Sequence, residues 1–253
     1  MPTHFAGDTT VLLGRSMRHI GRSPDTIITT VALPIAFMLL FVYVFGGAIQ
    51  HGSGSYVTYL LPGILLMTVA SSIGYTAARV FQDMQTGIFD RFQSMPIARS
   101  GVLWGHVLTS LVANLISLVV VVGVAVAMGF RTGPDVLAWL AVAAILLLFA
   151  LTLTWIAVIP GLAARSADGA SAFSYPIIFL PFISSAFVPT TTMPGPMRAF
   201  AEHQPVTSMV NAIRDLFTQH PVGSEIWIAL AWCVGILVVA FGVAIATYRR
   251  KIS

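Results

Sequence analysis

The side chains that could carry out catalysis are few and poorly arranged for it. Glu202 and His203 are adjacent and make up half of a metal-binding motif, but the H-E-x-x-H spacing is absent. Ser71 and Ser72 fall in an apolar segment, where small polar residues serve mainly as helix-packing contacts. An intramembrane hydrolase would need a serine with a histidine, or two carboxylates, in such a segment. We therefore expect no enzyme activity, and no catalytic, metal-binding or cofactor-binding residue.

ATP hydrolysis through a phosphate-binding loop of this chain is excluded by its lysine content. The only lysine is Lys251, so a phosphate-binding loop of the form G-x-x-x-x-G-K-[ST] cannot be present. The single cysteine excludes an internal disulfide and a zinc site built on several thiolates. If ATP drives this protein, another subunit must bind it.

The composition is that of a membrane protein. Hydrophobic residues make up 57% of the 253 residues and charged residues only 9%, against about 25% charged in soluble domains. This charge is too low to cover a water-facing surface, and the hydrophobicity is too high for a disordered chain.

The distribution of charges predicts an all-α protein with six transmembrane helices. Residues 26–78 contain no Lys, Arg, Asp or Glu; as one helix they would span roughly 80 Å, far more than a bilayer core of about 30 Å. The chain must fold back near residues 46–55. The expected spans are about 27–46, 56–78, 102–129, 136–159, 171–189 and 226–247. The first exceeds a signal-peptide core in length and is expected to be retained. The fifth is the least regular, because it contains Pro176, Pro181 and Pro189.

The basic residues predict the orientation. With six spans, ten of the 13 Lys and Arg residues fall on the side of both termini and three on the other. Positive residues concentrate on the cytoplasmic side of membrane proteins. We expect a multi-pass plasma-membrane protein with both termini in the cytoplasm. Topology thus explains the net charge of +4, and no nucleic-acid partner is expected.

The predicted spans contain no Asp, Glu, Lys or Arg, and His106 is the only imidazole within them. Ionisable residues inside a bilayer usually mark ion pathways. Their absence argues against an ion-coupled transporter and favours a passive membrane body driven by a separate soluble subunit. Such a body must offer its driver a cytoplasmic docking surface.

A cytoplasmic helix at about 86–95 is the first candidate for that surface. Ile88, Phe92 and Met95 share one apolar face, and Asp90 and Arg91 lie on the more polar side. The helix could lie on the lipid headgroups, or its aromatic face could fit a groove on a partner. Spacing alone leaves both interpretations open.

A second cytoplasmic element is an amphipathic helix at about 9–23, lying in the membrane plane. Its two faces are an apolar one and a basic one at helical spacing. It could serve as an anchor or contact a partner. The apolar residues are Leu13, Met17 and Ile20, and the basic ones are Arg15, Arg18 and Arg22.

The segment between spans five and six is too long to lack structure in a compact protein. We expect outer helices at about 196–219 that fold back on the bundle as a lid or re-entrant pair, one of them starting near Pro205. Its apolar face would be Val206, Met209, Val210, Ile213 and Phe217. For Arg214 and Asp215 we expect surface salt bridges.

Two stretches carry a resemblance to a known family. The first is Gly87–Arg99, an acidic-basic pair followed by Met95-Pro96-Ile97 and an arginine. The second comprises Phe187-Val188-Pro189, Met193-Pro194, Pro205-Val206-Thr207 and Ala212-Ile213-Arg214. With these motifs in this order, the chain resembles permeases of the ABC-2 type, close to the actinobacterial daunorubicin-resistance permeases. The resemblance covers nearly the whole chain, as a single transmembrane domain over 1–253.

The resemblance implies a division of labour. Two permeases, identical or related, would meet a dimer of ATP-binding subunits that hold ATP and Mg²⁺. The helix at 86–95 would be the coupling helix and the helix at 9–23 the connecting helix. The substrate path would lie between the two permeases, lined mainly by spans one, two and five, and would lead outward. The coupling contacts would be Phe89, Asp90, Arg91, Phe92, Met95 and Pro96.

An apolar interior suits a hydrophobic or amphipathic cargo, since it leaves no polar group unpaired. The predicted function is export of a hydrophobic drug, lipid or lipid-linked molecule. Alternatives are a polysaccharide or teichoic-acid exporter of the same fold, and a membrane scaffold without transport. Each candidate lining residue could instead pack between helices or face lipid. These candidates are Phe37, Phe41, Tyr59, Met67, Phe173, Tyr175 and Phe179.

Overall fold

The computed structural model describes residues 24–46, 55–86, 101–131, 133, 135–221 and 223–252. Within these ranges the regular structure is helical throughout, with no strand. This confirms the all-α prediction. The predicted amphipathic helix at 9–23 and the predicted coupling helix beyond Thr86 lie outside the described residues.

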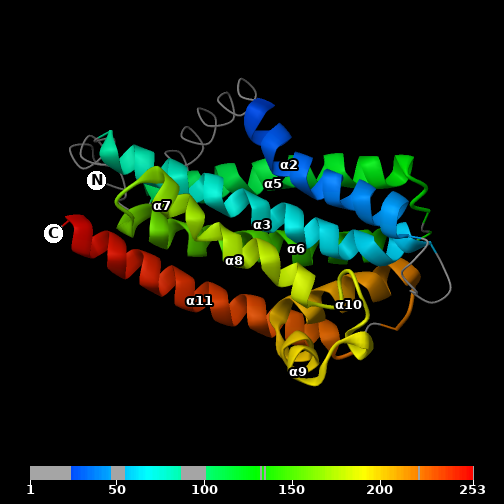
Figure 1. The fold of residues 1–253 in the computed structure, drawn as a ribbon. Coiled ribbons are helices and arrows are strands. Elements are labelled where there is room, and N and C mark those ends of the chain that lie inside the picture. The colour runs from blue at the N-terminus through cyan, green and yellow to red at the C-terminus, as the bar shows by residue number, and fades with distance from the viewer. Residues whose placement is uncertain are drawn as a thin grey trace.

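Among the described residues, four helices are long and apolar enough to cross a membrane. They are α3 (Tyr56–Gln85), α5 (Gly101–Ala127), α6 (Val136–Ala163) and α11 (Glu225–Ile252), which run side by side as an elongated bundle (Figure 1). Their apolar side chains are poorly solvated by water. In a helix the interior backbone N–H and C=O groups hydrogen-bond to one another, as a bilayer requires.

Two further apolar stretches are shorter and less regular. The first joins α2 (Pro24–Leu39), which contains Pro34, to the π-helical turn η1 (Leu40–Phe45). The second is broken into α7 (Ala167–Ala172), α8 (Ser174–Phe179) and the 3-10 turn η2 (Leu180–Ile183). Pro176 and Pro181 lie within this second stretch, and proline removes a backbone donor and crowds the preceding turn. The described residues thus form four long helices and two shorter stretches, where the sequence predicted six spans with an irregular fifth.

Helix α3 forms the centre of the bundle and is buried along most of its length. Small residues let its neighbours approach closely. A Cβ atom at Gly161 of α6 would lie 2.7 Å from the Cβ of Val80, and one at Gly74 would lie 2.8 Å from Ser174 Oγ. Helices in a membrane associate by such close packing, since lipid offers no hydrophobic drive toward association.

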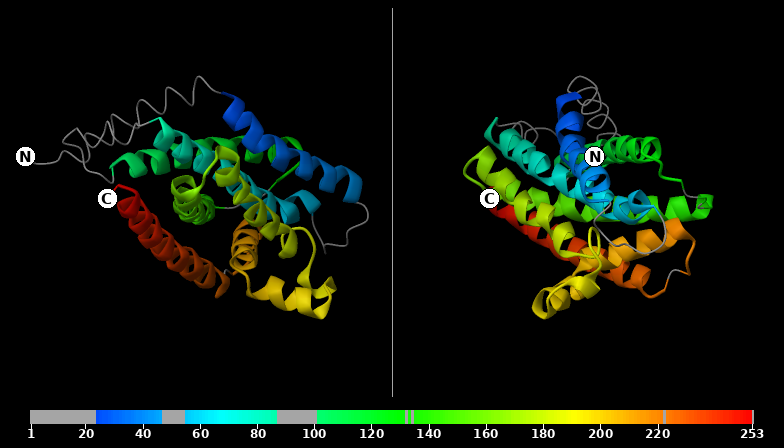
Figure 2. Two further views of the ribbon diagram at one scale, coloured as in Figure 1. Left: turned by 60° about the vertical axis from the view of Figure 1, so that its left-hand side comes forward. Right: turned by 45° about the vertical axis from the view of Figure 1, so that its right-hand side comes forward.

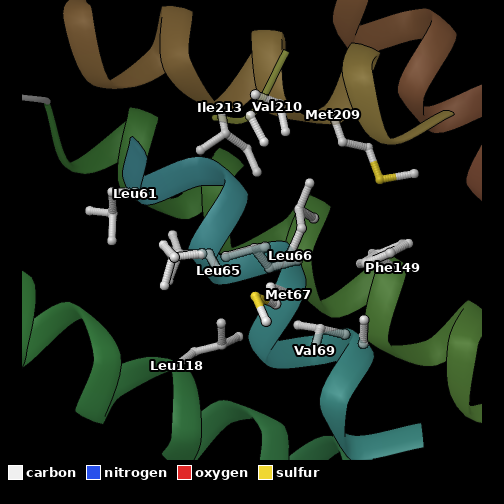
Figure 3. Close-up of a cluster of buried hydrophobic side chains, with 14 of the residues drawn as sticks. Leu61, Leu65, Leu66, Met67, Val69, Leu118, Phe149, Met209, Val210 and Ile213 are labelled. Carbon is white, nitrogen blue, oxygen red and sulfur yellow. The ribbon is translucent and has the colours of Figure 1, made fainter. Parts of the chain in front are cut away.

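The segment after η2 contains η3 (Thr190–Thr192), α9 (Gly195–His203) and α10 (Pro205–Thr218). All five residues of the predicted apolar face of α10 are buried. Figure 3 shows Val210 and Ile213 pointing from α10 toward α3, and Met209 pointing toward Phe149 of α6 within the same core cluster. Helix α10 therefore packs into the bundle, while α9 lies at the end opposite the C-terminus of α11 (Figure 2).

Helix α3 does not stop where the uncharged run stops. It continues from Ala78 through Arg79 and Asp83 to Gln85. Thr86 ends it by donating its backbone N–H to Gln82 O at 3.0 Å and its hydroxyl to Asp83 O at 3.2 Å. The charge pattern marked the apolar part of this helix, but the helical backbone extends beyond it.

Candidate functional site

A cluster of phenylalanine rings joins η1 and the end of α2 to the segment that follows α8. Phe37 meets Phe182 edge to face at 5.1 Å between ring centroids, and Phe41 meets Phe187 at 4.8 Å. Phe182 and Phe187 are stacked at 4.7 Å. Sequence reasoning selected Phe37 and Phe41 as candidate lining residues. It missed Phe182 and Phe187, although both lie in the irregular fifth segment.

The other candidate lining residues do not share one surface. Met67 is fully buried in the core that Figure 3 shows, whereas Phe173, Tyr175 and Phe179 are 46%, 62% and 59% exposed on the outside of the chain. Tyr59 reaches the same segment through its hydroxyl bond to Ser185 O, and the ring of the exposed Phe179 lies 5.9 Å from that of Phe182. Three of the seven candidates therefore face outward, where lipid or a second protein can reach them.

The break after η2 leaves backbone carbonyls that a continuous helix would have paired. Ser184 is extended, with φ −134° and ψ −177°. Ser185 O accepts from the Tyr59 hydroxyl at 3.1 Å and from Arg214 Nη2 at 2.8 Å. Phe187 O lies 3.4 Å from the Tyr56 hydroxyl. Side chains of α3 and α10 thus supply the donors that the broken helix lacks, as buried carbonyls require.

Arg214 connects three elements at this break. Its guanidinium donates to Ser185 O, to Tyr59 O at 3.2 Å and to Asn211 Oδ1 at 3.2 Å, and it lies 3.9 Å from the centre of the Tyr59 ring. Burial lowers the pKa of this guanidinium below its ordinary value, which still leaves the group charged. The expected surface salt bridge to an acidic residue is wrong, because Arg214 bonds to carbonyl oxygens and stacks on an aromatic ring.

Gln204, which lies between α9 and α10, also donates hydrogen bonds to the broken segment. Gln204 Nε2 donates to Leu180 O at 3.2 Å and also to Ile183 O. Within the described part of the chain, Gln204 Oε1 and Thr207 Oγ1 are buried without a hydrogen-bond partner. We use the name outer polar cluster for the break at residues 184–187 and the side chains around it. These side chains are Tyr56, Tyr59, Gln204, Asn211 and Arg214.

The remaining predicted outer residues mark the ends of helices. Met193 ends η3, Pro194 precedes α9, and α10 starts at Pro205. A proline in the first turn loses no helical hydrogen bond, which is why Pro205 fits there. Glu202 and His203 lie on α9, where Glu202 Oε1 accepts from Arg198 Nε at 2.7 Å. In the ranges that the structure describes, no group of three or more His, Cys, Asp or Glu could hold a metal ion.

The fold and this cluster define a helical membrane protein whose fifth apolar segment is broken and held by polar side chains. Residues 8–218 match the family model described as ABC-2 type transporter, and the chain belongs to that family. This confirms the resemblance found in the sequence.

Two relatives are similar over nearly their whole length. The daunorubicin resistance ABC transporter permease protein DrrB1 of Streptomyces coeruleorubidus is 28% identical over 240 residues, covering 94% of this chain and 85% of the relative. The probable doxorubicin resistance ABC transporter permease protein DrrC of Mycobacterium tuberculosis is 27% identical over 255 residues, covering 97% and 90%. The chain is therefore an ABC-2 permease homologous to permeases of drug-resistance ABC transporters.

Proposed function

We propose that this chain is the membrane-spanning subunit of an ATP-driven exporter for a hydrophobic or amphipathic drug, lipid or lipid-linked molecule. The observation that carries the proposal is the pairing of an ABC-2 membrane domain with a sequence whose only lysine is Lys251. Without a phosphate-binding loop, this chain needs a separate ATPase subunit, which would hold ATP and Mg²⁺.

In this proposal the chain crosses the plasma membrane six times, with α2–η1 and α7–η2 as the two shorter crossings and both termini in the cytoplasm. Arg249, Arg250 and Lys251 lie at one end of α11, and α9 lies at the other end of the bundle (Figure 2). The positive end supports a cytoplasmic C-terminus, and α9 and α10 then lie on the outer side.

The substrate path in this proposal lies between two permease copies, identical or related. The outward-facing Phe173, Tyr175 and Phe179 and the nearby phenylalanine cluster support this, because one chain alone does not enclose them. Apolar aromatic surfaces bind apolar cargo by removing its surface from water.

The coupling and connecting helices complete the proposal. The sequence around Phe89–Phe92 would seat against the ATPase, and the amphipathic helix at 9–23 would lie beside it in the membrane surface. When the ATPase subunits close on ATP, they would draw the two coupling helices together and change the side to which the central path opens.

Simultaneous replacement of Asp90, Arg91 and Phe92 by alanine tests this assignment. We expect the variant to insert into membranes normally, to lose at least tenfold in ATP-dependent efflux and to pull down little ATPase, because the charged and aromatic contacts are removed. The measurements are copurification of the ATPase and uptake of doxorubicin into inverted membrane vesicles.

Alanine at Thr190, Thr191 and Thr192, at the predicted outer end, is the matched control and should leave copurification unchanged. Unchanged complex formation and transport in the triple variant would contradict the coupling assignment. ATP turnover that does not depend on the permease would favour a scaffold instead.

A further inference from the structure

A row of polar side chains joins α3 to α5 through the middle of the bundle. Thr76 Oγ1 and Ser110 Oγ lie 2.9 Å apart, and Asn114 Nδ2 donates to Ser72 Oγ at 2.9 Å. At one end, His106 Nε2 lies 3.0 Å from Asp83 Oδ2. The sequence does not show which residues of the two helices face each other, so only their pairing in the structure reveals the row.

The row follows from helix geometry. His106, Ser110 and Asn114 are four residues apart and therefore share one face of α5, as Ser72 and Thr76 do on α3. The order is antiparallel: the partner positions on α3 descend toward Ser72 as those on α5 rise toward Asn114. Asn114 and Thr76 are 1% and 4% exposed, so the pairs are shielded from lipid.

Asn114 is less favourable for the stability of the bundle than an apolar residue would be. Its Nδ2 bonds both Ser72 Oγ and Ser110 O, but its Oδ1 is buried without a partner among the described residues. An unpaired buried acceptor is destabilising, a penalty that leucine would not have. An amide kept at such a site points to a role in specifying how α3 and α5 pair.

The row joins the two helices on which the predicted coupling segment would act. Helices α3 and α5 flank the predicted coupling segment, which joins the end of α3 at Thr86 to the start of α5 at Gly101. A displacement of that segment acts on both helices at once. Side-chain hydrogen bonds between membrane helices are individually modest, but several of them in one row favour a single register of the two helices.

We infer that this polar row makes α3 and α5 one rigid unit, which transmits movement of the coupling segment to the phenylalanine cluster and the outer polar cluster. The inference rests on the proposed function. Asn114, Ser72, Thr76 and Ser110 are positioning residues that contact no substrate. Helix α3 packs on α7 and α10, so movement of the unit reaches the broken segment and the outer helices.

A covalent lock tests the inference directly. In a background with the single cysteine replaced by Cys233→Ala, the variant Thr76→Cys with Ser110→Cys places two thiols where the hydroxyl oxygens are 2.9 Å apart. Mild oxidation should form the disulfide in the complex with its ATPase. Because the unit does not open, we expect the oxidised complex to keep at least half of the doxorubicin transport and ATP turnover of the reduced complex.

Two results would overturn the inference: failure of the disulfide to form, or a tenfold loss of transport on oxidation that reduction restores. Wild-type complex whose ATP turnover does not depend on the permease would instead count against the proposed function, so the two failures are distinguishable.

If the reduced cysteine variant is already inactive, the double variant Thr76→Val with Ser110→Ala tests the inference instead. We expect at least fivefold more ATP hydrolysed per doxorubicin transported, with complex assembly unchanged. Thr68→Val and Thr109→Val are the matched controls, because these buried hydroxyls bond only to a carbonyl of their own helix. A wild-type ratio in the double variant, or an equal rise in the controls, would refute a transmitting role.

Discussion

Arg214→Met should destabilise the end of the bundle that carries α10 by about 3 kcal/mol, because charge-assisted hydrogen bonds and a cation–aromatic contact are lost. Methionine fills a similar volume but offers no donor to Ser185 O, Tyr59 O or Asn211 Oδ1. Ser185 O still accepts a hydrogen bond from the Tyr59 hydroxyl, so the contacts that hold the broken segment are weakened but not all lost. Thermal unfolding of the detergent-solubilised chain, followed by size-exclusion chromatography, measures the change.

Arg198→Met is the matched control. This arginine is exposed on α9 and pairs with exposed Glu202, and exposed pairs contribute little to stability. Its substitution should leave the unfolding temperature nearly unchanged. Arg214→Lys should lie between the two, since lysine keeps the charge but lacks the planar fork of donors. Equal effects at Arg214 and Arg198 would contradict the structural role of the outer polar cluster.

Gly161→Ala should destabilise the chain by several kcal/mol, although alanine is ordinarily the better helix former by about 1 kcal/mol. A Cβ there would lie 2.7 Å from the Cβ of Val80 and 2.8 Å from Ala77 O, and neither atom can move without shifting α3. Overpacking of this kind costs about 1–3 kcal/mol, and more where backbone must move. The expected result is a strong fall in folded yield and in unfolding temperature.

The same substitution at Gly123 separates packing from helix propensity. Gly123 lies inside α5, and a Cβ there would meet no atom within 4 Å in the described structure. Gly123→Ala should therefore be neutral or slightly stabilising. If Gly161→Ala were tolerated equally well, the close approach of α6 to α3 would not be a determinant of stability.

Much of the fold could be predicted because charge is excluded from a bilayer. The uncharged runs coincide with most of α5, α6 and α11, and helical spacing identified the buried face of α10. The run that ends at Ala78 does not end α3, because a helix needs no change of backbone where its side chains become charged. The prolines signalled an irregular fifth segment but not where it breaks.

The candidate site was harder to predict for a physical reason. Arg214 and Gln204 bond to main-chain carbonyls, which every residue possesses, so no sequence pattern marks the partners. The pairing of Asn114 with Ser72 depends on the register of two helices that are separate in the sequence. Hydrophobic periodicity locates a helix face, but the relative displacement of two helices along their axes follows only from three-dimensional packing.

Helix α11 makes the protein sensitive to membrane thickness. The uncharged part of this helix, residues 226–248, spans roughly 35 Å, longer than a hydrocarbon core of about 30 Å. It packs on α6 and α10, and its other face leaves Trp227, Val238 and Val239 strongly exposed. A helix longer than the bilayer tilts to fit, so lipids with shorter acyl chains increase its inclination. Because α10 packs on α11 and carries Arg214, acyl-chain length becomes a means of altering the outer polar cluster without changing a residue.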